Sequence, residues 1–144
     1  MASLRSIKWQ LLIMTGLGTY ILLIAITLPY MWFYGQFSDV GHEMEYYSER
    51  ADQMIPSFIF CLSPFVMYII GRWLCERAGQ LFYWYAILYF LTQEVIDILL
   101  VGSTGKLSEF FQPSLFVVYA AKLAGCLAAA AIASRTQKTR LVVE

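Results

Sequence analysis

The sequence contains no asparagine and a single histidine, His42. The lack of asparagine excludes N-x-Ser/Thr glycosylation. A single histidine excludes haem held by two histidines, and metal centres built on several histidines, within one chain. His42 lies beside Glu43 and Glu45, but charged runs of this kind usually form solvated loops. We therefore expect the protein to hold neither a metal ion nor a cofactor.

Sequence motifs of the common enzyme classes are missing as well. The chain has no P-loop, no G-x-S-x-G nucleophile motif and no H-E-x-x-H zinc motif. Its 3 cysteines, Cys61, Cys75 and Cys126, have no C-x-x-C spacing and no obvious pairing, so we expect no disulfide framework. We do not expect an enzyme, although acids and a lysine inside the apolar stretches could transfer protons to a lipid-soluble substrate. Nucleic acid is not an expected partner.

Charged residues are scarce, at 14% of the 144 residues, whereas 60% are hydrophobic. A soluble domain of this length would need more polar surface. Residues 9–34, 55–74, 81–101 and 113–134 form apolar stretches of the length that crosses a lipid bilayer, about 20 residues. The sequence therefore predicts an all-α integral membrane protein, a four-helix bundle in which residues 1–144 form a single transmembrane domain.

The basic residues are distributed unevenly over the segments that flank these stretches. Most of them fall in the terminal segments, or from the last residues of the second stretch to the start of the third: Arg5, Lys8, Arg72, Arg77, Arg135, Lys138 and Arg140. Because positively charged segments tend to stay in the cytoplasm, we expect both termini there, in a bacterial inner membrane or another cell membrane. Residues 35–54 then form an outer loop, in which residues 40–54 have the spacing of a short amphipathic helix.

The third stretch carries Gln93, Glu94 and Asp97, although a charge near the bilayer centre costs at least about 2.5–3.5 kcal/mol. With about 100° per residue, the two carboxylates share one helix face with other side chains of the stretch. These are Tyr83, Ile87, Phe90 and Val101. We predict that this face points into the bundle. Lys122 reaches a similar depth on the neighbouring fourth stretch, which predicts a Glu94–Lys122 ion pair.

These three charges do not balance, because Glu94 and Asp97 oppose the single ammonium of Lys122. An unpaired buried carboxylate is strongly disfavoured in a medium of low dielectric. The surplus acid must therefore be protonated, contact water or hold a cation. We take Gln93, Glu94, Asp97 and Lys122 as candidate ligand-binding residues.

Nearby aromatic residues could line the same pocket and attract a cation through their ring faces. The candidates are Tyr83, Tyr89, Phe90 and Tyr119. The commoner role of aromatic residues in membrane helices is to lie at the interface or in the core. Both interpretations of these four residues stay open.

Two functional hypotheses follow. In the first, the bundle binds and transports a cation, a proton or a small cationic or amphiphilic solute through the Glu/Asp/Lys site. In the second, the protein is a non-catalytic accessory, immunity or assembly subunit, and the same charges recognise the membrane helices of a partner. The ion pair could also do no more than fix how the helices pack.

Small residues recur at four-residue spacing in the fourth stretch. They form two rows, Ala121, Gly125, Ala129 and Ala120, Ala124, Ala128. Such rows let helices approach closely, either within one chain or between copies in a homo-oligomer. A second copy or another membrane protein is therefore an expected partner beside the lipid bilayer.

Overall fold

The computed structural model describes residues 7–37, 44–77, 81–103, 105 and 113–143. Over these residues the chain forms the helices α1 (Trp9–Phe37), α2 (Met44–Arg77), α3 (Phe82–Ser103) and α5 (Pro113–Val143) and no strand. The all-α prediction is therefore confirmed for the described part of the chain. Several residues named in the predictions lie outside the described part of the chain, either entirely or with their side chains: Arg5, His42, Glu43, Glu45, Val101, Lys138 and Arg140.

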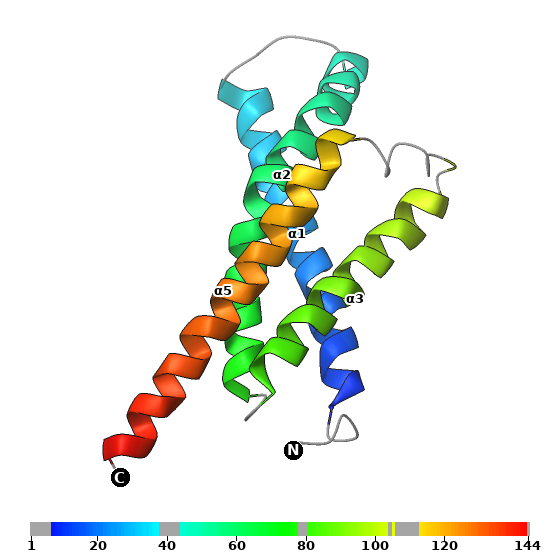
Figure 1. Ribbon diagram of the computed structural model, residues 1–144. Coiled ribbons are helices and arrows are strands. Elements are labelled where there is room, and N and C mark those ends of the chain that lie inside the picture. The colour runs from blue at the N-terminus through cyan, green and yellow to red at the C-terminus, as the bar shows by residue number, and fades with distance from the viewer. Residues whose placement is uncertain (1–6, 38–43, 78–80, 104, 106–112, 144) are drawn as a thin grey trace.

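The helices run alternately up and down, so the start of α1 and the end of α5 lie at the same end of the bundle (Figure 1). Helix α5 packs most extensively against α2 and next against α3, while α1 packs against both α2 and α3. Helices α3 and α5 diverge toward the end at which α5 begins (Figure 1).

Among the described residues, three segments are long and apolar enough to cross a membrane: Trp9–Phe37, Phe58–Arg77 and Leu115–Gln137. Many large apolar side chains on these helices are exposed, as expected for a surface covered by lipid. They include Met14, Ile21, Leu28, Phe65, Ile69 and Val117. Helix α3, which carries Gln93, Glu94 and Asp97, is not one of the three segments. Its 22 residues give a length of about 33 Å, which is enough to cross a hydrocarbon core of about 30 Å. That α3 crosses the membrane stays a prediction.

The helices extend beyond the predicted stretches. Helix α1 continues to Phe37, and α2 begins at Met44, so that residues 44–54 of the expected outer loop belong to one helix with residues 55–77. This segment is rich in Glu, Arg, Ala, Gln and Met, which favour helix. No separate amphipathic helix is present over residues 44–54. Helix α2 has 34 residues, about 51 Å, so it must tilt or protrude from a hydrocarbon core of about 30 Å.

Close packing between α2 and α5 depends on one glycine. A Cβ atom at Gly125 would lie 2.7 Å from the carbonyl oxygen of Pro64, and one at Gly71 would lie 3.5 Å from the Cβ of Ala129. The row of small residues through Gly125 and Ala129 therefore faces α2. Pro64 has no amide hydrogen for the Phe60 carbonyl, which accepts a long hydrogen bond of 3.5 Å from the Ser63 hydroxyl instead.

Helices α1 and α3 are joined by a similar close contact. A Cβ atom at Gly16 would lie 2.9 Å from Cγ2 of Thr92, and the hydroxyls of Thr19 and Tyr89 form a buried hydrogen bond of 2.6 Å. Near the start of α1, the amide of Lys8 donates to the Tyr85 hydroxyl at 2.9 Å. These contacts determine which side of α3 faces the bundle.

Replacing Gly125 with alanine is expected to destabilise the bundle by about 1–3 kcal/mol, because the added methyl group meets backbone that cannot move out of its way. The matched control is Gly18→Ala, where nothing lies within 4 Å of the new Cβ. That change should leave stability unchanged or raise it through better helix propensity. Thermal unfolding in detergent, followed by circular dichroism, measures both. Equal effects of the two substitutions would contradict the close α2–α5 contact.

Candidate functional site

Lys122 lies between two carboxylates of α3. Its Nζ donates to Oε1 of Glu94 at 3.1 Å and to Oδ2 of Asp97 at 2.7 Å. The predicted Glu94–Lys122 contact is therefore confirmed, and Asp97 makes the shorter of the two bonds. Glu94 and Asp97 are three residues apart on one helix, a spacing that lets both reach a single ammonium on the neighbouring helix.

All three charged side chains are largely removed from the surface. Their exposed fractions are 9% for Lys122, 12% for Glu94 and 22% for Asp97. The Tyr119 ring, nearly one turn before Lys122 on α5, lies 5.8 Å from Nζ and adds a cation–π contact. The most exposed of the three is Asp97, which lies closest to the end of α3.

The prediction that one face of α3 points into the bundle is wrong for the first half of the helix. Tyr83 is 51% exposed and Ile87 is exposed too, whereas Ala86, Tyr89 and Gln93 are buried. The rotation of α3 follows from its contacts with α1, which bring Tyr89 to the centre of the bundle. The carboxylates consequently lie at the edge of the buried face, on the side of α5.

Two buried oxygen atoms at this site have no hydrogen-bond partner among the described residues. They are Oε1 of Gln93 and Oε2 of Glu94. The side chain of Gln93 is almost fully enclosed, because the residue is only 1% exposed. Leaving a buried acceptor unsatisfied costs about 1–3 kcal/mol, and buried acceptors normally contact a donor, an ion or ordered water. The site thus has two buried hydrogen-bond acceptors that no donor of the described residues satisfies.

A cavity of about 50 Å³ lies against Gln93, and each of the four helices contributes a polar side chain to its wall. These side chains are Tyr20 of α1, Ser63 of α2, Gln93 and Asp97 of α3, and Lys122 of α5. The remaining wall is apolar and comes from α1 and α2, through Leu23, Ile24, Ile59 and Met67. A space of this size holds a few water molecules or one small ion.

A larger and more open pocket of about 240 Å³ adjoins the cavity. The two share Tyr20, Ile59, Ser63, Asp97 and Lys122 in their walls. The larger pocket, hereafter the wedge, is completed by Phe60 of α2, Leu100 of α3, and Leu115, Val118 and Tyr119 of α5. Asp97 and Lys122 therefore separate an enclosed cavity from a pocket that opens toward the surface.

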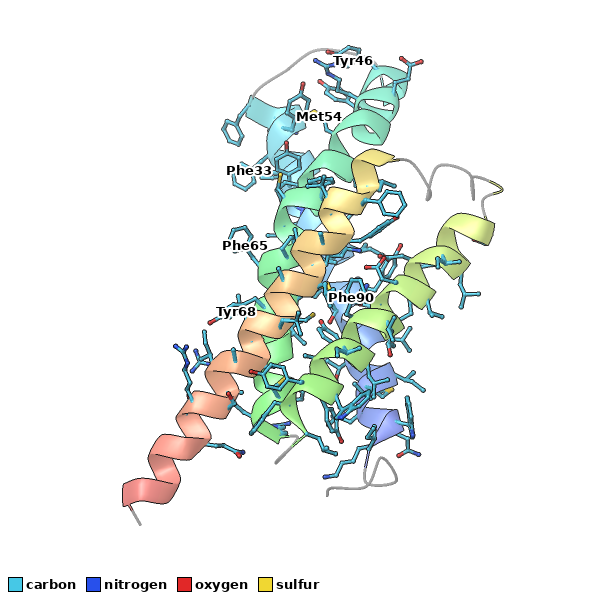
Figure 2. The ribbon with its side chains drawn as sticks, viewed as in Figure 1. Phe33, Tyr46, Met54, Phe65, Tyr68 and Phe90 are labelled. Carbon is cyan, nitrogen blue, oxygen red and sulfur yellow. The ribbon has the colours of Figure 1, made fainter. Side chains whose placement is uncertain are left out.

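The predicted aromatic residues differ in their positions. Tyr119 lines the larger pocket, whereas Tyr83, Tyr89 and Phe90 line neither of the two pockets beside Asp97. Tyr89 lies in the core, and Phe90 packs against that core; Figure 2 shows Phe90 in the middle of the bundle. A role of these three aromatic residues in ligand binding finds no support in their placement.

Tyr20 and Ser63 line both pockets but were not among the predicted site residues. Each is a polar side chain in the middle of an otherwise apolar stretch. That signal was present in the sequence, as it was for Gln93. The charged residues within the apolar stretches lie only on α3 and α5. The contributions of Tyr20 and Ser63 depend instead on how α1 and α2 are rotated about their axes.

No family model, curated protein or solved structure matches this chain. No three His, Cys, Asp or Glu residues of the described segments gather into a group that could hold a metal ion.

Replacing Lys122 with methionine should destabilise the bundle by about 3–5 kcal/mol, since it leaves two carboxylates buried without their counter-charge. Adding Asp97→Asn and Glu94→Gln to this variant should restore most of the loss. The control is Arg72→Met, which breaks the Arg72–Glu76 pair, whose side chains are both 45% exposed, and should have a much smaller effect. Unfolding is measured in detergent. A triple variant as unstable as Lys122→Met would contradict the electrostatic explanation.

Proposed function

We propose that this protein crosses the membrane with four helices and binds and transports a cation, a proton or a small cationic or amphiphilic solute. Glu94 and Asp97 supply the negative site, and Lys122 is the internal counter-charge. The observation that carries the proposal is the sharing of one ammonium by two carboxylates beside a pocket of about 240 Å³ that opens toward the surface.

A packing role alone would favour a balanced and fully enclosed pair. Instead, the site has a surplus negative charge, because two carboxylates face one ammonium. Asp97 and Lys122 also line both pockets, so that a solute in the wedge reaches them directly. Ionisable groups within membrane spans commonly mark the path of an ion or proton.

The proposed mechanism is a competition for the carboxylates. A cation that enters the wedge meets Asp97 first and weakens its bond to Lys122. The ammonium keeps its contact with Glu94, so it remains paired while the cation is bound. A proton competes for the same carboxylates, so binding of any other cation should weaken as the pH falls.

The distribution of charge along the bundle supports an orientation with both termini in the cytoplasm. Lys8, Arg72, Arg77 and Arg135 lie at or near the end of the bundle where α1 starts and α2 and α5 end. Arg50 lies at the opposite end, together with acidic residues of α2 such as Glu49. The wedge then opens in the outer half of the membrane, and the acidic outer segment attracts cations toward it.

Glu94→Gln and Asp97→Asn are expected to lower cation uptake by about tenfold or more, because each removes one of the two negative charges that share Lys122. Uptake is measured in liposomes containing the purified protein, at several pH values, with a fluorescent pH indicator and with radioactive or fluorescent cations. The matched control is Glu76→Gln, whose carboxylate lies in a surface pair. Unchanged uptake in both variants would remove the site from the transport mechanism.

The alternative, an accessory subunit that recognises a partner's helices, is favoured by one observation. Of the two rows of small residues on α5, the row Ala120, Ala124 and Ala128 is exposed. Such a row suits close contact with a helix of another chain.

If that contact exists, Ala124→Leu should lower cross-linking to another membrane protein or to a second copy, because the larger side chain holds the helices apart. The control is Ala25→Leu, at an exposed alanine of α1. Cross-linking in native membranes is the measurement. Equal cross-linking in the wild type and in both variants would argue against a contact through this row.

A further inference from the structure

We propose that the cation taken by this site is a small monovalent inorganic ion, of which Na⁺ is the type, and that Gln93 is the residue that selects it. The ion lies in the cavity of about 50 Å³, with the amide oxygen of Gln93 and the Asp97 carboxylate as ligands. This inference rests on the proposed function, which leaves the class of cation open between inorganic ions, protons and organic cations.

The size of the cavity limits the class of cation. One water molecule needs about 10–15 Å³ of such space, so a cavity of about 50 Å³ accepts a small ion with a few waters. An organic cation with several carbon groups does not fit there. Such a solute could occupy only the larger pocket, where Asp97 and Lys122 are the charged groups in the wall and Gln93 is out of reach.

The chemistry of the wall favours a metal cation over an organic one. Gln93 lines the cavity, is 1% exposed, and has an Oε1 without a hydrogen-bond partner in the described part of the chain. Ser63 and Tyr20 add hydroxyl groups to the same wall. Neutral and anionic oxygen atoms are the ligands that hard cations prefer.

The charge balance favours a monovalent ion. Glu94, Asp97 and Lys122 together carry a surplus of one negative charge when both acids are ionised. A monovalent cation neutralises that surplus, whereas a divalent cation would leave a net positive charge in a medium of low dielectric. The carboxylates thus supply attraction for any cation, while the cavity and Gln93 supply the selection by size and ligand type.

Two substitutions of Gln93 separate oxygen coordination from packing. Gln93→Met keeps the approximate volume but removes the amide oxygen, and should weaken Na⁺ binding by about tenfold or more. Gln93→Glu keeps an oxygen atom at the same place and should retain Na⁺ binding. The matched control is Gln10→Met, at an exposed glutamine of α1, which should bind Na⁺ as the wild type does.

The full chain is purified in detergent and titrated with NaCl, with choline chloride keeping the ionic strength constant, and the heat of binding is recorded. LiCl, KCl, MgCl₂ and tetraphenylphosphonium chloride are titrated in the same way. Circular dichroism checks that each variant is folded. We expect saturable binding of Na⁺, weaker binding of Mg²⁺, and tetraphenylphosphonium binding, if any, that Gln93→Met leaves unchanged.

The inference is overturned if the folded wild type binds no alkali cation, if Gln93→Met binds Na⁺ normally, or if Gln93→Glu loses binding as Gln93→Met does. These results leave the proposed function standing, provided that proton or organic-cation uptake in liposomes still depends on Glu94 and Asp97. Uptake that ignores both carboxylates removes the proposed function itself. Proton uptake without Na⁺ binding would identify a proton site and would overturn the Na⁺ inference.

Discussion

Lys122 lies between two carboxylates in the interior of a bundle whose outer surface is largely apolar, and this contact constrains the other helices. In a medium of low dielectric none of the three groups can be left without a partner at a small cost. The contact therefore determines the depth of α5 relative to α3. It also explains why α3 can carry polar residues that would be unfavourable against lipid.

The contact of Glu94 with Lys122 could be predicted from the sequence because it depends only on the depth of each residue and on which helices are neighbours. The rise of a helix gives the depth of each residue, and a short connection places the two helices side by side. No such contact was predicted for Asp97, although its bond to Lys122 is the shorter of the two. The row of small residues through Gly125 predicted a close helix contact, which the structure assigns to α2.

The rotation of α3 could not be predicted in this way, because it depends on a pair of contacts between distant parts of the chain. Gly16 lets α1 approach Thr92, and the Thr19–Tyr89 hydrogen bond then turns Tyr89 inward. As a result Tyr83 faces outward, although it shares a stripe with the carboxylates. The same reasoning applies to Tyr20 and Ser63, whose place in the site depends on how α1 and α2 are turned.

Close contacts at two glycines join α1 to α3, through Gly16, and α2 to α5, through Gly125. Glu94 and Asp97 belong to the first pair, and Lys122 belongs to the second. Any rocking of one pair against the other must lengthen or shorten the bonds of the ammonium to its carboxylates. A change in the charge of either carboxylate would therefore alter how the two pairs pack, and a change in packing would alter the affinity of the carboxylates for a proton.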